Sequence, residues 1–517
     1  MMRRFLTSAL LALVSIVAVA RVYVATDKPC YIAGERIWCS VFCARGPAVA
    51  YLELISSEGP VARTRIDING GRGGGSLLIP PVTPTGNYRL YAYTGYEDIS
   101  SDGPVLSVFN TSSTARVKDG VEIVTPAEYS HSSPVQTGYG FSVNTDGDRI
   151  ILENTSGSRV SCCVSLTRGD SVAASGYHSI ASFDPGTATE ESFGETLAAK
   201  LAGADVPAVE SRLLRDSLSV SAIVAVPGSG TDCYAGHYRG DGLFEFETEN
   251  IFGGGDMVYL LDGLEPGQDC HLEPVSPFLS PAADDIPKLK LCRSMERDLV
   301  RRMAALAEER SSDTLAVTLP MRREHFFLSH ECVAYVLDDY TRFPTMEEVF
   351  VEITQNVKLR RRDGKTRISA LMNTSVLEET TRWGDVVTMV DGVPVLDQNL
   401  IDTYDPAVVK VVEIYPYRYD LGGKTFDGVV NLVTFKGNMP GVMFDDNVRI
   451  YDFHGCAWPM EHRGAETPFW HPLLTLEPGE RFEIAPASME AGACYTISVD
   501  GLTAGERAVY LRKSFIR

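Results

Sequence analysis

The sequence predicts a mainly β fold, with tandem β-sandwich domains followed by a small α/β domain and a C-terminal β-domain. Short segments in which apolar and polar residues alternate recur along the chain, as half-buried strands require. Between them lie turns rich in glycine and proline, of which the chain has 45 and 28. Short strands separated by such turns are typical of β-sandwiches, whereas helical patterns are confined to a few segments.

The composition is that of an acidic globular protein. Of the 517 residues, 44% are hydrophobic and 22% are charged, which suits about three or four domains with ordinary cores. The net charge of −21 repels nucleic acid phosphates and anionic lipid headgroups, so neither is expected as a partner. The 11 cysteines are odd in number, and their spacing alone predicts no disulfide pairing.

The first residues have the features of a removable signal peptide. Arg3 and Arg4 precede the apolar run Phe5–Val17, and Ala18 to Ala20 supply the small residues of a cleavage site. A retained N-terminal anchor is the alternative. No later segment is long and apolar enough to span a membrane. We therefore expect an exported protein of the periplasm, outer membrane or cell surface, without a direct membrane span.

Changes of pattern along the chain predict its domain boundaries. The segments are a signal peptide at 1–20, a first β-sandwich at 21–112, a second β-rich domain at 113–220, a third at 221–286, a linker helix at 287–310, a connector at 311–342, an α/β domain at 343–440 and a C-terminal β-domain at 441–517.

Two motifs in the first sandwich resemble a macroglobulin-type domain. Thr26–Trp38, with the sequence TDKPCYIAGERIW, is similar to the pattern T-D-[KR]-P-x-Y-x-x-G-E that opens this domain. Pro84–Tyr88, with the sequence PTGNY, is similar to its P-x-G-x-Y strand entry. The resemblance implies a β-sandwich, in which Gly34 and Gly86 allow the chain to turn.

Two segments have helical periodicity. Phe193, Leu197 and Leu201 recur every four residues and predict a helix over Ser192–Leu201. A longer apolar stripe predicts a helix over Pro287–Arg310, which would pack between domains or serve as a linker.

The α/β domain opens with a helix and a hairpin. Thr345–Glu348 is a capping box that predicts a helix start. Asp363–Gly364 predicts a hairpin turn. The hairpin strands carry a basic run, interpreted first as a solvated face and alternatively as a docking patch for an acidic partner: Lys358, Arg360, Arg361, Arg362, Lys365 and Arg367.

Three further segments resemble the plug domain of TonB-dependent outer-membrane receptors. Val386–Val395 contains VDGVP, Asp405–Tyr415 reads DPAVVKVVEIY, and Gly428–Gly437 reads GVVNLVTFKG. Residues 438–517 are too few for the β-barrel of a receptor, so the resemblance implies a plug-like domain without a pore. The combined order of domains resembles exported proteins of Gram-negative bacteria rich in nutrient-uptake systems.

No motif points to a catalytic residue, a metal or a cofactor. Gly455–Cys456 begins like the macroglobulin thioester motif G-C-x-E-Q but lacks the Glu-Gln pair, so no thioester is expected. His454, Cys456, His462 and His471 lack the tight spacing of structural zinc sites and are interpreted as scattered side chains. No G-x-S-x-G nucleophile elbow is present in the sequence. We therefore expect a protein that is not an enzyme and uses no cofactor.

These observations lead us to expect a non-enzymatic binding or scaffold protein of the Gram-negative envelope, accessory to outer-membrane transport. Its partner would be an envelope protein, such as an outer-membrane transport component. The alternatives are a non-covalent macroglobulin-type protease inhibitor or surface-defence protein and, third, an unrecognised hydrolase. We expect the interaction residues in two exposed turns, because binding concentrates on loops held by a rigid framework: Asp391, Gly392, Val393, Pro394, Arg418, Tyr419, Gly422 and Gly423. The alternative is that the glycines in these turns only satisfy the backbone geometry of the turn.

Overall fold

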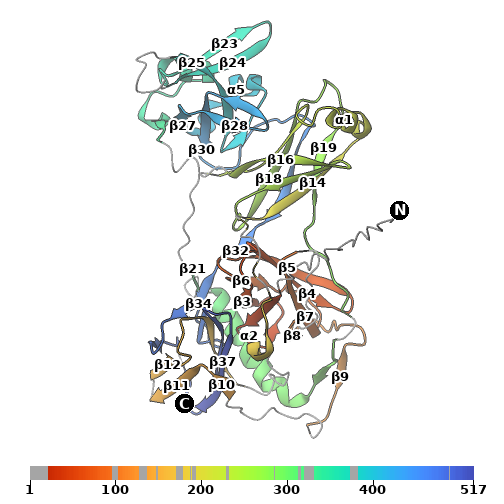
Figure 1. The fold of residues 1–517 in the computed structure, drawn as a ribbon, viewed down its shortest axis with the longest axis vertical. Coiled ribbons are helices and arrows are strands. Elements are labelled where there is room, and N and C mark those ends of the chain that lie inside the picture. The colour runs from red at the N-terminus through yellow and green to blue at the C-terminus, as the bar shows by residue number, and fades with distance from the viewer. Residues whose placement is uncertain are drawn as a thin grey trace, which may run out of the picture.

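The computed structural model confirms the mainly β fold class, with many short strands in several sheets (Figure 1). It describes residues 21–95, 103–126, 137–146, 149–169, 178–186, 188, 192, 194–228, 232–283, 286–311, 316–318, 331–372, 382–487 and 489–517. The expected signal peptide lies outside the described residues.

The first unit is a β-sandwich built mainly from residues 22–109. One sheet has the order β1 (Val22–Thr26), β3 (Arg36–Cys43) and β6 (Arg72–Leu78); the other has the order β2 (Cys30–Ile32), β8 (Val105–Phe109), β7 (Gly86–Tyr93), β4 (Val49–Ser56), β5 (Gly59–Asp67) and β32 (Cys456–Ala457). Tyr31, Leu52 and Tyr88 are fully buried in its core. Burial of such large side chains supplies most of the stabilisation of a sandwich.

The second unit combines strands from three separate parts of the sequence. Its larger sheet has the order β10 (Thr137–Tyr139), β37 (Ala508–Ile516), β36 (Cys494–Thr503), β13 (Val160–Arg168), β34 (Phe469–Leu476), β33 (Met460–His462) and β21 (Ala316–Thr318), and its smaller sheet the order β11 (Phe141–Asp146), β12 (Arg149–Asn154) and β35 (Arg481–Ile484). Val160 lies opposite Leu476 on one side and Thr503 on the other. The early strand β13 is thus inserted between two late strands.

Two glycines of β6 are required by close packing. A Cβ atom on Gly74 would lie 2.7 Å from Cβ of Pro472 in β34 of the second unit. Within the first sandwich, a Cβ atom on Gly73 would lie 2.1 Å from the carbonyl oxygen of Asp67. Real Cβ atoms do not reach such distances, so the glycine run is required by packing.

The third unit is a single long sheet with a short helix, α1 (Val206–Leu213). Its order is β19 (His271–Val275), β14 (Thr196–Ala202), β17 (Leu243–Glu247), β16 (Asp232–Gly240), β15 (Ser221–Val226), β18 (Gly254–Asp262) and β31 (Val448–His454). The helix predicted over Ser192–Leu201 is wrong, because residues 196–202 form β14. Leu197 and Leu201 share one face in a strand as they do in a helix, and Ala199 between them is buried on that same face.

The fourth unit is an α/β domain. Its sheet has the order β22 (Val333–Val336), β27 (Val409–Tyr415), β30 (Gly428–Thr434), β25 (Arg382–Val390), β24 (Lys365–Met372) and β23 (Val357–Arg362), and β26 (Val393–Pro394) pairs with β25. The domain also contains two helices, α4 (Met346–Glu352) and α5 (Gln398–Asp402). A separate hairpin is formed by β28 (Tyr419–Leu421) and β29 (Lys424–Phe426). The predicted capping box is confirmed, since the Glu348 N–H donates to the Thr345 hydroxyl at 3.2 Å. The predicted hairpin is confirmed, with Asp363 and Gly364 both at positive φ.

The units are nested along the chain. The third unit begins after β13 of the second, and the α/β domain interrupts the third unit before β31 completes its sheet. Residues 448–516 then contribute to three earlier units through β31, β32 and β33–β37. This pairing differs from the expected separate C-terminal domain at 441–517, and the other predicted boundaries remain predictions. In Figure 1 the α/β domain stands at one end, the two sandwiches at the other, and the third sheet between them.

The predicted linker helix is present as α2 (Glu296–Ser311), which starts later than the expected 287. It follows β20 (Leu289–Leu291), which pairs with β9 (Val121–Ile123). Met295 and Leu306 pack against Ile32 and Phe109 of the first sandwich. Among the described residues, no helix is long and apolar enough to cross a membrane.

Candidate binding cleft

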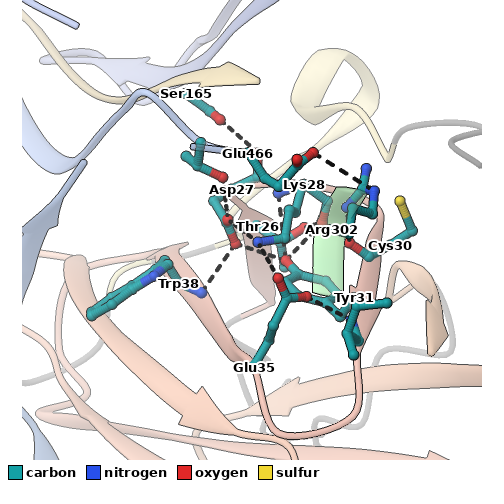
Figure 2. A network of polar contacts seen from close by, with 12 residues as sticks. Thr26, Asp27, Lys28, Cys30, Tyr31, Glu35, Trp38, Ser165, Arg302 and Glu466 are labelled. Atoms are coloured by element: carbon teal, nitrogen blue, oxygen red, sulfur yellow. Dashed lines mark hydrogen bonds and ion pairs between the residues drawn. The ribbon is translucent and has the colours of Figure 1, made fainter. Parts of the chain in front are cut away.

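A buried polar network centred on Asp27 connects the two sandwiches (Figure 2). One oxygen of the Asp27 carboxylate accepts hydrogen bonds from the Tyr31 hydroxyl at 2.7 Å and from the Trp38 N–H at 3.1 Å. Its other oxygen accepts from the Thr467 hydroxyl at 2.9 Å. The Ser165 hydroxyl donates to the Asp27 carbonyl oxygen at 2.5 Å. Since Ser165 and Thr467 belong to the second unit, these bonds hold that unit against the first.

Lys28 is buried beside two carboxylates. Its Nζ lies 3.5 Å from Asp27 and 3.4 Å from Glu35. Glu35 also accepts a hydrogen bond from the Ile32 N–H at 2.6 Å, which fixes the turn between β2 and β3. Burial acts to lower the pKa of Lys28, but the charges of Glu35 and Asp27 outweigh it and raise the pKa above its ordinary value. The motif residues Asp27, Lys28 and Glu35 therefore form an ion-paired internal junction.

Two arginines hold α2 against this junction. Arg302 donates to the Cys30 carbonyl oxygen at 3.3 Å, and its Nε lies 3.7 Å from Glu466 (Figure 2). Arg301 also pairs with Glu466. Near the end of α2, burial raises the pKa of Glu309, although the charge of Lys28 opposes this shift. The helix thus becomes a fixed wall beside the first sandwich.

The described residues enclose a cleft of about 960 Å³ beside the network. This volume is near the upper end of the range for ligand pockets, which commonly lie between domains. Residues from several parts of the chain line it, among them buried side chains at its floor: Lys28, Glu35, Trp38, Leu306 and His462. Its exposed rim includes Arg36, Arg63, Leu78, His454 and Trp458.

Aromatic stacking fixes two walls of the cleft. The rings of Trp38 and His462 are stacked with centroids 4.8 Å apart. Burial and the charge of Lys28 together lower the pKa of His462 to about 4, against the charge of Asp27, so this imidazole is neutral at pH 7. Trp458 stacks on Phe252 at 4.5 Å and remains 39% exposed. The cleft therefore has an apolar aromatic surface that is present before any ligand binds.

The expectation that Asp391–Pro394 is an exposed turn is wrong, because Asp391, Gly392, Val393 and Pro394 are all buried. The Asp391 carboxylate accepts hydrogen bonds from the Thr434 N–H and hydroxyl, both at 2.7 Å, and from the Met439 N–H at 2.8 Å. The Asp391 carbonyl oxygen accepts from the Gly228 N–H of the third unit at 2.9 Å. Asp391 and Gly392 have φ of 49° and 81°, as the turn geometry requires.

The second predicted turn packs against the third sheet. The Ser221 hydroxyl donates to the Gly422 carbonyl oxygen, and Lys424 pairs with Asp262. A Cβ atom on Gly423 would lie 3.3 Å from Leu218. Tyr419 is half-buried, with its pKa raised by burial and by Cys233, whereas Arg418 is exposed and pairs with Asp420 at 3.2 Å. Both predicted turns thus lie at an interface within the chain, and an external partner for them remains a prediction.

The side chains weighed as metal ligands have other neighbours. His462 stacks on Trp38, and Nε2 of His471 lies 3.2 Å from Glu461. His454 lies on the cleft rim, and Cys456 is buried in β32. In the part of the chain that the structure describes, no group of three or more His, Cys, Asp or Glu side chains could hold a metal ion.

Sequence patterns did not mark the cleft rim as a binding surface. The motif of Thr26–Trp38 supplies floor residues and one rim residue, Arg36, whereas Arg63 and Trp458 come from other segments of the chain. No local pattern marks such residues, since only the nested pairing of strands brings them together.

Comparisons with known proteins give distant structural similarity. No protein-family model matches the sequence, and no curated protein does. Among solved structures, a mutant of Salmonella alpha-2-macroglobulin has 8% identity and a TM-score of 0.15, with 95% of this chain and 23% of that chain covered. Native E. coli alpha-2-macroglobulin has 10% identity and a TM-score of 0.16, with 96% and 22% covered. The E. coli protein activated by porcine elastase has 9% identity and a TM-score of 0.23, with 96% and 43% covered.

The chain spans less than half the length of these solved proteins. The TM-scores are too low to establish a common arrangement of domains. The chain is a mainly β protein with a distant structural match to bacterial alpha-2-macroglobulins.

Proposed function

We propose that this protein is a non-enzymatic binding scaffold of the Gram-negative envelope, with an envelope protein such as an outer-membrane transport component as its partner. The nested arrangement carries the proposal. Asp391 and Gly422 lie in turns that hold the α/β domain against the third sheet, and β31 joins that sheet directly to the end of the domain. A scaffold must hold its binding surfaces at fixed positions, and this arrangement supplies that rigidity.

The plug-like resemblance supports the choice of partner class. The three segments that carry it form β25, β27 and β30, which are neighbours in one sheet. The α/β domain stands at the end of the molecule away from the two sandwiches, so its outer face is accessible to a partner (Figure 1). Loops and faces held by a rigid framework are where binding concentrates.

Photo-crosslinking in cells that make the protein naturally tests this proposal. A crosslinking amino acid is placed at Tyr340, which is 46% exposed on the α/β domain, and the envelope is fractionated after irradiation. We expect the protein in the envelope fraction and a discrete adduct with an outer-membrane protein. Recovery of the native protein from the cytoplasm alone, or no adduct from the envelope, would contradict the proposal.

A further inference from the structure

We propose that the cleft beside the Asp27 network binds an extended peptide segment of a partner protein that carries acidic and apolar side chains. This inference rests on the proposed binding function and names the ligand of a site far from the α/β domain.

Strand edges at the cleft favour an extended peptide. β6 is the last strand of its three-stranded sheet, and its residues Ser76–Leu78 line the cleft. In the other sheet, the outer edge of β5 pairs with the short strand β32. Among the described residues, this pairing involves only Arg65 and Ile66 of β5. Arg63 and Thr64 are next along this edge and line the cleft. Edges of both sheets therefore meet there, and strand edges bind extended peptides through main-chain hydrogen bonds.

The strand β32 shows how a chain segment fits against this edge. Cys456 and Ala457 pair in parallel with Arg65 and Ile66, although they come from a distant part of the sequence. This short strand leaves the preceding part of β5 paired only with β4 among the described residues. A partner peptide would continue the same mode of pairing.

The charge of the rim favours an acidic ligand. Arg36 is exposed, and the hydrogen bond that the structure gives it, at 3.2 Å, is to the neutral hydroxyl of Ser76. Arg63 is held in place by Glu53 at 2.9 Å. At the floor, Glu35 is already paired with Lys28. The other acidic side chain of the lining, Glu309, lies within reach of the charge of Lys28. Among the described cations of the lining, Arg36 is therefore the one whose partner is neutral, and in a protein of net charge −21 it supplies a local attraction for carboxylates.

Apolar side chains at the rim supply anchoring contacts. Leu78 is 49% exposed and Trp458 is 39% exposed, and both line the cleft. Tryptophan and arginine are among the residues that contribute most to binding energy at protein interfaces. Stacking on Phe252 keeps the Trp458 indole in place, so little ordering is needed when a peptide binds.

Fluorescence anisotropy of the full chain with a labelled peptide tests the inference. The probe is a short synthetic peptide of alternating glutamate and valine, and a matched peptide of lysine and valine is its control. We expect saturable binding of the acidic peptide below about 1 mM, and binding at least about tenfold weaker for the basic one. Arg36→Glu and Trp458→Ala should each weaken binding of the acidic peptide by about tenfold.

Arg362→Glu is the matched control, because it reverses a charge on the exposed hairpin of the α/β domain, where the Arg362 side chain is 93% exposed. It should leave peptide binding unchanged. Circular dichroism and thermal melting confirm that each variant is folded. Absence of acidic-peptide binding at about 1 mM would overturn the inference. Equal loss of binding in Arg36→Glu and Arg362→Glu would also overturn it, because the attraction would then follow total charge. Crosslinking from Tyr340 reports on the proposed function separately.

Discussion

The carboxylate of Asp27 and the hydroxyl of Thr467 are 2.9 Å apart, although 440 positions separate them in the sequence. The contact is buried and joins the first strand region to the last part of the chain. The same carboxylate lies 3.5 Å from Lys28. The macroglobulin-like motif thus contributes to stability by linking two units.

Replacement of Asp27 should destabilise the whole protein. Asp27→Asn removes the negative charge beside the buried Lys28 ammonium, and breaking a buried ion pair in this way costs about 3 kcal/mol. Glu483→Gln is the control, since its partner Arg149 is 3.8 Å away and both side chains are mostly exposed. Denaturant unfolding followed by circular dichroism should show a large loss for the first variant and almost none for the second. Equal stability of the two variants would refute the role of the network.

Two buried groups should give the stability opposite dependences on pH. Burial raises the pKa of Asp500 to about 6, against the charge of Arg512, and it lowers the pKa of His462 to about 4. From about pH 4 to 6, folded Asp500 keeps a proton that the unfolded chain releases, so its contribution falls as the pH rises. Unfolded His462 takes up a proton below about pH 6.5 that the folded state excludes, so its contribution falls as the pH decreases.

Single variants separate these two effects. Asp500→Asn should make stability increase with pH between about pH 4 and 6, relative to the wild type, by roughly 2–3 kcal/mol across this window. His462→Gln should change the dependence in the opposite direction by a similar amount. Urea unfolding at a series of pH values measures both. Parallel pH profiles for the wild type and both variants would show that neither group titrates as described.

Docking of the α/β domain on the third sheet should depend on a glycine. Gly422 has φ of 57°, and a Cβ atom there would lie 2.9 Å from Cβ of Ser221. Gly437 has a similar φ of 68° and open space around it. Alanine at either site carries a similar backbone cost of about 1 kcal/mol, but only Gly422→Ala also disturbs the interface. Limited proteolysis should therefore release the α/β domain faster from Gly422→Ala than from Gly437→Ala; equal rates would contradict this docking.

The protein should not inhibit proteases. The macroglobulin-like residues Asp27, Lys28 and Glu35 are buried in the internal junction, so their resemblance provides no exposed inhibitory surface. A panel of serine and cysteine proteases, incubated with an excess of the full chain, should cleave protein substrates at unchanged rates. Stoichiometric loss of protease activity would favour the inhibitor alternative instead.

Local patterns predicted elements well when neighbours in sequence determined them. The capping box at Thr345 and the Asp363–Gly364 hairpin form as expected, because each depends on adjacent residues. The pattern over Ser192–Leu201 failed because Leu197 and Leu201 share a face in both a helix and a strand. Pairing with β17 and β19 decides between them, and local sequence does not contain that information.

Long-range pairing also explains the errors about the site. An Asp–Gly turn is commonly exposed, but the Asp391 carboxylate is turned inward to accept hydrogen bonds from Thr434 and Met439. The cleft depends on Trp458 and Arg63, which only the return of the chain through the first sandwich brings together. Sequence reasoning therefore reached the strands and the floor motif, but not the surface where we propose that a partner binds.

Photo-crosslinking in living cells tests most directly the claim that the cleft of this scaffold binds a segment of a protein partner. The crosslinking amino acid replaces Leu78 on the rim, and Val82, which is 81% exposed in the same unit, is the control position. The account predicts a discrete protein adduct from Leu78 that disappears when Arg36→Glu is added, and no such adduct from Val82. The same adducts from both positions, or an adduct from Leu78 that persists with Arg36→Glu, would contradict it.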